Sequence, residues 1–273
     1  MKSTAPTLTH VIPSQGKDGV TALTSLGDDV FVVRLWSQQV EVYDARTFAL
    51  QGNIVVPRLE CSWGLAACAH YKCLYVSDSD HDSIHRAELS DSSPVKQWSV
   101  ARGPRGLLVN KAHNVVVACC EADKIQVYTT RGDLVREIGL RQADVMSSWH
   151  AVQLSTGHYV VSQCTSPGVV SVVGVDRQVV RSYRPSQTSD VGKIRYPGSL
   201  AVTKNDDVLV ADSKNNRIVS LNSSMSSAQQ LTLPVDDGIK EPCGLCLDES
   251  RGRLYVGESL GSSRVLVFDC VRL

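Results

Sequence analysis

The sequence predicts an all-β protein, a six-bladed β-propeller built from four-stranded antiparallel blades. Short apolar runs rich in β-branched residues fill the chain, and turn residues such as Gly and Asp separate them. The runs recur with a spacing of 42–49 residues, which is typical of a propeller blade that carries several short strands. No part of the sequence shows the sustained periodicity of an amphipathic helix.

The strands of one repeat are clearest in RYPGSLAVTKNDDVLVADSKNNRIVSL, residues 195–221. A first apolar run ends in polar residues, and a second run closes on Asp212. Asn205-Asp206 supplies the hairpin turn between these two runs. After a polar loop, a third run begins at Arg217. These runs predict the three inner strands of one blade.

The same pattern occurs six times. Segments 62–89, 104–139 and 242–269 match the template well, and segments 19–44 and 148–176 are weaker copies. The first apolar positions of the six copies are Ala22, Leu65, Leu107, Ala151, Leu200 and Leu245. The blades therefore begin near residues 19, 62, 104, 148, 197 and 242, and we expect residues 1–273 to form one propeller domain.

The fourth strand of a blade is clearest at Asp133–Ile138, after the turn signal Arg131-Gly132. The sixth copy ends after its third strand, whereas a spare segment, Thr7–Ile12, precedes the first copy. We expect Thr7–Ile12 to supply the outer strand of the sixth blade. This pairing closes the ring between the two ends of the chain and removes an exposed sheet edge.

The fifth copy resembles an NHL repeat in its residues Pro-Gly-Ser-Leu-Ala-Val (197–202), Val-Leu-Val-Ala-Asp (208–212) and Asn-Asn-Arg-Ile (215–218). Asp78 and Glu258 stand where Asp212 closes the second strand, and Arg264 matches Arg217. The resemblance implies a six-bladed propeller like the C-terminal NHL domain of tripartite-motif proteins, and hence a module that binds protein or RNA. The sequence contains no RING-finger or B-box zinc pattern, so the resemblance does not imply ligase activity.

Composition narrows the function classes. Lys plus Arg and Asp plus Glu number 28 each, so the balance of charge gives no pointer to nucleic acid. No signal peptide and no apolar run of about 18 residues is present, which predicts a cytoplasmic protein with no membrane association. The nine cysteines are odd in number and irregularly spaced, and we expect them to be reduced residues, most of them in the core.

In a propeller, the loops that enter the first strands and those that join the second strands to the third lie on one face. We expect a ligand to bind there, because loops vary while the blades stay rigid. The candidate residues on this face are large aromatic or basic side chains: Trp36, Trp63, Arg105, Lys124, Trp149, His150, Lys193, Arg195, Tyr196, Lys214, Arg217 and Lys240.

Each set of candidates has a second interpretation. The tryptophans are either anchors for a peptide or stacked bases, or packing residues between neighbouring blades. The basic residues of the fifth copy either contact the phosphates of single-stranded RNA or are ordinary solvated charges. Arg217 in particular has a structural alternative, an ion pair with Asp212 inside its own blade.

The first strands, which line the central channel, carry few catalytic side chains: His150, Asn110 and Gln153. We expect no cofactor and no bound metal.

Two motifs that resemble metal or redox sites are incomplete. The acidic run 78–83 lacks the glycine and the distal glutamate of a calcium-binding loop. Cys243 and Cys246 have the spacing of a redox pair, but they lie on a predicted strand, without the helix that lowers a thiol pKa. The sequence thus predicts a non-catalytic, monomeric module for a protein partner or single-stranded RNA; the alternative is a propeller hydrolase, lyase or synthase with its site in the channel.

Overall fold

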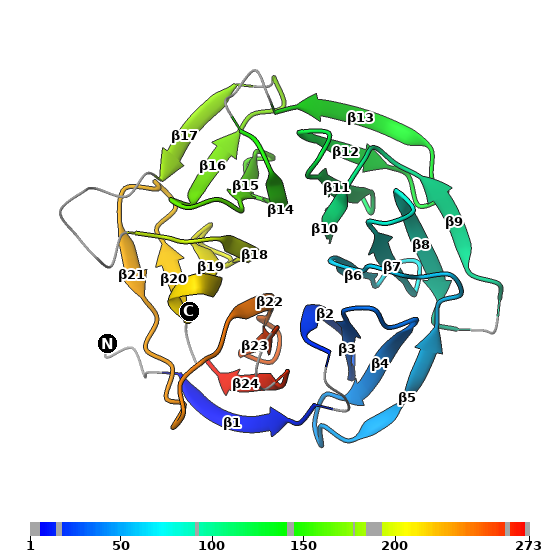
Figure 1. Ribbon diagram of the computed structural model, residues 1–273, viewed down its shortest axis with the longest axis horizontal. Helices are drawn as coiled ribbons and strands as arrows, with labels where there is room; N and C mark the ends of the chain where they lie inside the picture. The colour runs from blue at the N-terminus through cyan, green and yellow to red at the C-terminus, as the bar shows by residue number, and fades with distance from the viewer. Residues whose placement is uncertain are drawn as a thin grey trace.

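Six four-stranded antiparallel sheets surround a central axis in the computed structural model, which confirms the predicted propeller (Figure 1). The structure describes residues 6–14, 18–90, 93–140, 145–176, 178–183, 193–259 and 263–270. Within these ranges the one helical element is a 3₁₀ turn, Ser213–Asn215.

The first strand of each blade lies nearest the axis, and the fourth lies on the outside. The first strands are β2 (Val20–Leu26), β6 (Leu65–Cys68), β10 (Pro104–Val109), β14 (Ser148–Gln153), β18 (Pro197–Val202) and β22 (Pro242–Asp248). The second strands are β3 (Asp29–Arg34), β7 (Cys73–Asp78), β11 (Val115–Cys119), β15 (Tyr159–Gln163), β19 (Val208–Asp212) and β23 (Arg253–Glu258).

The outer half of each blade follows the same order. The third strands are β4 (Gln39–Asp44), β8 (Ser83–Glu88), β12 (Lys124–Tyr128), β16 (Val169–Val173), β20 (Arg217–Leu221) and β24 (Val265–Asp269). The outer strands are β5 (Leu50–Val55), β9 (Lys96–Ser99), β13 (Leu134–Gly139), β17 (Val179–Tyr183), β21 (Ala228–Gln230) and β1 (Thr7–Ile12).

The strand register reproduces the alignment of the six sequence copies. In every blade the aligned first-strand residue is buried and pairs with a valine of the second strand. The pairs are Ala22–Val33, Leu65–Val76, Leu107–Val117, Ala151–Val161, Leu200–Val210 and Leu245–Val256. One position of the repeat therefore marks the same depth in every blade.

The ring closes between the two ends of the chain, as the sequence predicts. Strand β1 pairs antiparallel with β24 and becomes the outer strand of the last sheet. Ile12 lies opposite Val265, and both side chains are fully buried. The pairing covers the free edge of β24 and completes the sixth blade.

Neighbouring blades are joined by polar side chains just before three of the third strands. Each of these residues has a left-handed backbone, and its side-chain oxygen accepts a hydrogen bond from a backbone N–H at the entrance to the next blade. The donor–acceptor pairs are Gly103–Asp82 at 2.8 Å, Ser147–Asp123 at 3.0 Å and Glu241–Asn216 at 2.8 Å. These bonds fix the loops in relation to one another.

All nine cysteines are free thiols. Among the described residues, no helix has the length and apolar character needed to span a membrane.

Candidate functional site

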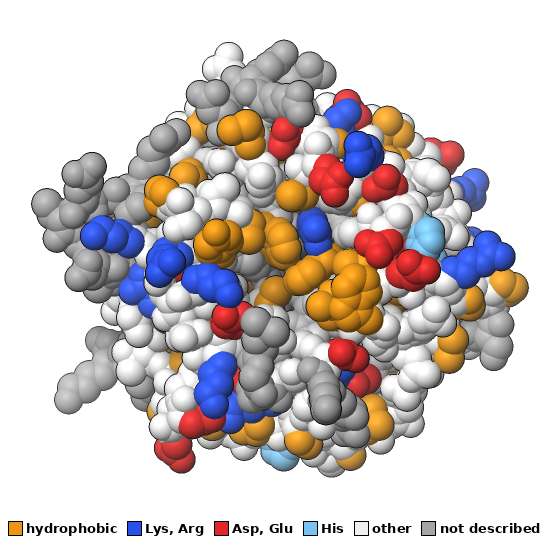
Figure 2. All heavy atoms as spheres, in the orientation of Figure 1, with side chains coloured by type: hydrophobic (Ala, Val, Ile, Leu, Met, Phe, Trp, Pro, Cys, Tyr) orange, Lys and Arg blue, Asp and Glu red, His pale blue; other side chains and the backbone are white. Residues whose placement is uncertain are grey.

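The loops that enter the first strands and the loops between second and third strands form one surface, here called the loop face, which is turned toward the viewer in Figure 2. Hydrophobic side chains gather around the middle of this surface. Basic side chains lie on the side of β18–β21, and acidic ones lie over β6–β12. The face therefore has an apolar centre between two regions of opposite charge.

Three of the predicted residues meet at this centre: Trp63, Arg105 and Trp149, here called the axial cluster. The two indole rings are in edge-to-face contact, with their centroids 4.9 Å apart. The guanidinium carbon of Arg105 lies 5.0 Å from the ring centroid of Trp63 and 4.7 Å from that of Trp149. All three side chains are partly exposed, and their contacts connect blades 2, 3 and 4, so the tryptophans both pack between blades and reach the surface. Cation–π attraction holds the guanidinium against both rings.

The cluster forms because its members occupy the same position in three successive blades. Each lies two residues before the aligned first-strand residue, Leu65, Leu107 or Ala151. The first strands converge on the axis, so side chains at that position reach the same level of the channel mouth. The six-copy alignment contains this signal, although individual loops do not show that the three residues meet.

Arg105 makes no ion pair with any carboxylate in the described part of the chain, and its Nε atom is buried without a hydrogen-bond partner. The Cys120 thiol is one of its ionisable neighbours. Burial raises the pKa of Cys120 more than the nearby Arg105 lowers it, so the thiol is neutral at pH 7. The positive charge of Arg105 is therefore not neutralised within the described structure.

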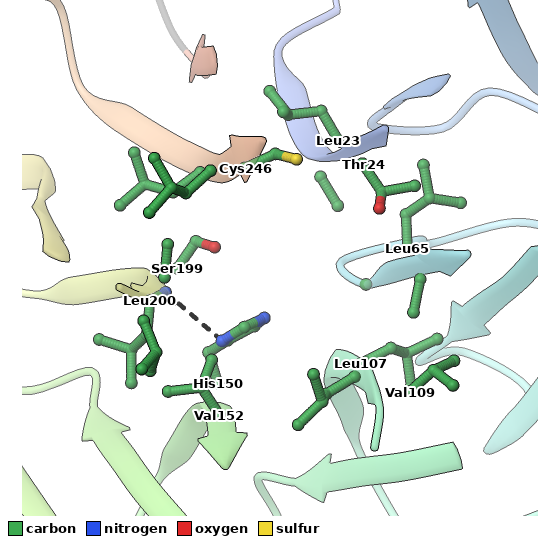
Figure 3. Close-up of a pocket in the computed structure, with 18 of the residues that line it drawn as sticks. Leu23, Thr24, Leu65, Leu107, Val109, His150, Val152, Ser199, Leu200 and Cys246 are labelled. Atoms are coloured by element: carbon green, nitrogen blue, oxygen red, sulfur yellow. Dashed lines mark hydrogen bonds between the residues drawn. The ribbon is translucent and has the colours of Figure 1, made fainter. Parts of the chain in front are cut away.

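Below the axial cluster lies a channel of about 540 Å³, which is within the size range of ligand pockets. Most of the residues that line it are apolar, among them Leu23, Leu65, Leu107 and Val152 (Figure 3). Asp206 and Glu249 lie at the opposite end, in turns between first and second strands, where they accept hydrogen bonds from Ser155 and Lys204. The carboxylates of the channel are thus far from the loop face.

His150 lies in the channel wall one residue deeper than Trp149. Its Nδ1 accepts a hydrogen bond from the backbone N–H of Leu200 at 3.4 Å (Figure 3). Burial lowers the pKa of His150 to about 4, so the imidazole is neutral at pH 7. The ring occupies space left by Gly106, where a Cβ atom would lie 2.1 Å from His150 Cδ2. His150 presents an N–H donor, and no described carboxylate orients it.

Trp36 and Tyr196 are the exposed aromatic residues among the predicted set. Their side chains are 61% and 40% exposed, and both have positive φ angles, 62° and 53°. Non-glycine residues seldom adopt this backbone conformation, and aromatic ones carry a steric cost there. The loops thus hold two large side chains outward at the surface rather than in the core.

Most of the predicted basic residues already have acidic partners. Lys124 pairs with Glu137 at 2.9 Å, Lys214 with Glu241 at 2.7 Å, Arg217 with Asp212 at 2.7 Å and Lys240 with Asp237 at 2.9 Å. Lys193 and Arg195 line a second, smaller hollow beside β20, together with Asn215, Arg217 and Gln230. The Arg217 pairing is the structural alternative that the sequence left open.

A charged residue at the end of the second strand supports the loop face in several blades. Asp212 and Glu258 bind Arg217 and Arg264 within their own blades. In blade 2 the corresponding Asp78 lacks an arginine partner and instead accepts a hydrogen bond from His81 at 2.8 Å, with His85 Nε2 at 3.6 Å. Burial by itself would raise the pKa of Asp78. The two histidine contacts and the backbone N–H groups of Cys61 and Glu60 outweigh burial and hold this pKa well below its usual range.

The stability of blade 2 is expected to depend on pH through His81. Its hydrogen bond with Asp78 raises the pKa of His81 above the ordinary value. The stabilisation is therefore complete below about pH 6.5 and is lost as the pH rises through the raised pKa. Thermal melts between pH 5.5 and 8.5 should show this loss in the wild type and a flatter profile in His81→Gln. An unchanged profile in that variant would contradict the assignment; His158→Gln, at a histidine with no described carboxylate contact, is the control.

Residues 195–219 match the family model of the NHL repeat. The match spans β18, β19 and most of β20, the segment with the clearest repeat pattern. It identifies one repeat of this kind within the propeller. No curated protein matches the chain.

Several solved structures share the fold. Hydrazine synthase of Kuenenia stuttgartiensis is 17% identical with a TM-score of 0.69, covering 95% of this chain and 97% of its own. Virginiamycin B lyase from Staphylococcus aureus is 10% identical with a TM-score of 0.70, covering 97% and 99%. The WD40 propeller domain of Doa1 is 13% identical with a TM-score of 0.65, covering 97% of each chain. At these identities the likeness shows the fold alone.

Proposed function

We propose that the chain is a non-catalytic recognition module that binds a peptide segment of a protein partner across the loop face. The axial cluster is the observation that carries this proposal. Two partly exposed tryptophans and an arginine without a carboxylate partner lie at the mouth of the channel, and these residue types dominate the binding energy of protein interfaces. Trp36 and Tyr196 extend the aromatic surface outward.

The likeness to tripartite-motif NHL domains is part of the proposal, and the NHL match at residues 195–219 supports it. We also propose a cytoplasmic, monomeric domain, and the nine free cysteines suit a reducing compartment. Single-stranded RNA is the weaker ligand on this face. RNA binding depends on several phosphate contacts, and Lys124, Lys214, Arg217 and Lys240 are engaged with carboxylates.

An enzyme with its site in the channel is the second candidate, and His150 is the residue that favours it. Histidine is the side chain most often used for acid–base chemistry, and His150 lies beside a cavity of about 540 Å³. Burial lowers its pKa to about 4, however, which makes it a weak base at pH 7. Two of the proteins with this fold are named as a lyase and a synthase. The described carboxylates of the channel, however, lie at its other end, away from His150. The binding function therefore has the stronger support.

Trp36→Ala is expected to weaken peptide binding at least tenfold without changing the melting temperature. Truncation removes a large contact surface, but 61% of the side chain is already exposed in the free protein. Fluorescence anisotropy with labelled peptides selected on the wild type measures the change. Tyr71→Ala removes a similarly exposed aromatic residue from a turn on the opposite face and should leave binding unchanged. Equal affinities for all three proteins would rule out Trp36 as a contact.

A further inference from the structure

We propose that Arg105 is a receptor for a carboxylate group of the bound peptide, inserted at the channel mouth between Trp63 and Trp149. This inference rests on the proposed function and specifies the chemistry of its ligand. It assigns a role to a cation that nothing in the described structure neutralises. The argument rests on charge, hydrogen bonding and the shape of the site.

The first step concerns charge. Among the described arginines of the loop face, Arg34, Arg102, Arg217 and Arg264 form ion pairs with carboxylates. Arg58 and Arg195 form no ion pair in the described structure, but both are exposed to water. Arg105 lies at the centre, is only partly exposed, and has two aromatic faces in place of an acid. Removing a charge from water without a partner is costly, so a site of this kind gains most from an anionic ligand.

The second step concerns the donors of Arg105. A guanidinium carries five N–H donors in a planar fork. The Arg105 donors reach the Cys120 thiol but make no hydrogen bond to a described carboxylate or carbonyl group. Nε is buried and without a partner. Contacts with the rings of Trp63 and Trp149 limit the side chain to one region of the channel mouth, so less conformational entropy is lost when an acceptor binds.

The third step selects the anion. A carboxylate carries one negative charge and matches a guanidinium in a planar, bidentate arrangement. Phosphate monoesters carry more charge, and an RNA backbone brings a series of singly charged phosphates, one per nucleotide. The axial cluster supplies a single cation among apolar neighbours, which suits one carboxylate. The source of the group is either an Asp or Glu side chain or the free C-terminus of a peptide.

A peptide selection distinguishes the two sources. Bead-bound libraries of nine randomised residues are offered to the wild-type protein, one with free C-terminal carboxylates and one with carboxamides. We expect the selected peptides to share one carboxylate. If its source is a side chain, an Asp or Glu is shared by the peptides from both libraries. If its source is the C-terminus, only the library with free C-terminal carboxylates yields binders. Converting that group to its amide should weaken binding to the wild type at least tenfold, measured by fluorescence anisotropy.

The protein side of the experiment compares Arg105→Gln and Arg105→Lys with the wild type. Arg105→Gln should bind the acid and the amide forms of the peptide with affinities within twofold of each other, because the interacting charge is gone. Arg105→Lys should retain part of the preference for the acid. Circular dichroism and thermal melts report folding; if Arg105→Gln does not fold, the acid-to-amide comparison on the wild type decides the question.

The outcomes separate this inference from the proposed function. Two results would overturn the inference and leave peptide recognition standing, provided that binding depends on Trp36. In the first, the selected peptides share no carboxylate. In the second, Arg105→Gln prefers the acid form over the amide form as strongly as the wild type does. If neither library yields a binder, both proposals fail. Binding of a single-stranded RNA pool in that case, with loss in Arg105→Gln, would assign Arg105 to phosphate instead and overturn the carboxylate.

Discussion

Asp212→Ala is expected to lower the free energy of unfolding by about 3–5 kcal/mol, the range for removing one partner of a buried ion pair. The Asp212 carboxylate is fully buried. It accepts hydrogen bonds from Arg217 Nε at 2.7 Å, the Arg195 backbone N–H at 2.7 Å and Asn215 Nδ2 at 2.8 Å. Its loss leaves the mostly buried Arg217 guanidinium without its carboxylate and frees the loop that enters blade 5. Urea and thermal unfolding measure the effect, which corresponds to roughly 10 °C in melting temperature.

Asp28→Ala is the matched control for this prediction. Asp28 pairs with Arg251 at 2.6 Å, but its side chain is 64% exposed. Exposed ion pairs contribute at most about 1 kcal/mol, since water solvates both charges when the pair is broken. Equal destabilisation by the two variants would show that burial of the Asp212 carboxylate is not the source of its effect.

Gly64→Ala is expected to destabilise the protein by about 3 kcal/mol or more and to disturb the axial cluster. A Cβ atom at residue 64 would lie 2.1 Å from the backbone oxygen of Arg105, far inside van der Waals contact. The obstacle is backbone rather than a flexible side chain, so blades 2 and 3 must move apart. That movement would also separate Trp63 from Arg105. Thermal unfolding measures the loss of stability, and tryptophan fluorescence reports the altered surroundings of the rings.

Gly52→Ala provides the comparison. Gly52 lies in the outer strand β5, and a Cβ atom there meets no other atom within 4 Å. Alanine should therefore leave the stability unchanged or raise it slightly, because it restricts the unfolded chain. If Gly64→Ala were tolerated as well as Gly52→Ala, the close packing of the first strands around the axis would be refuted.

The architecture of this protein follows from local patterns in its sequence. Each strand is specified by a few adjacent residues, and the six copies repeat that local pattern, so strand order, register and blade number can be read along the chain. The position of Ala22 and its five counterparts predicted the same pairing in every blade. The missing strand of the sixth copy and the spare segment Thr7–Ile12 were enough to predict ring closure.

The candidate site, by contrast, is assembled by contacts between blades that no local pattern specifies. Trp63, Arg105 and Trp149 are separated by more than 40 residues from one blade to the next, and they meet because the first strands converge on one axis. The sequence suggested Lys214 as a ligand-binding residue. In the structure its Nζ lies 2.7 Å from Oε1 of Glu241, a residue of the adjacent blade. Local patterns specify the strands of a propeller, whereas the contacts between blades depend on the closed ring, and the candidate site lies where those contacts converge.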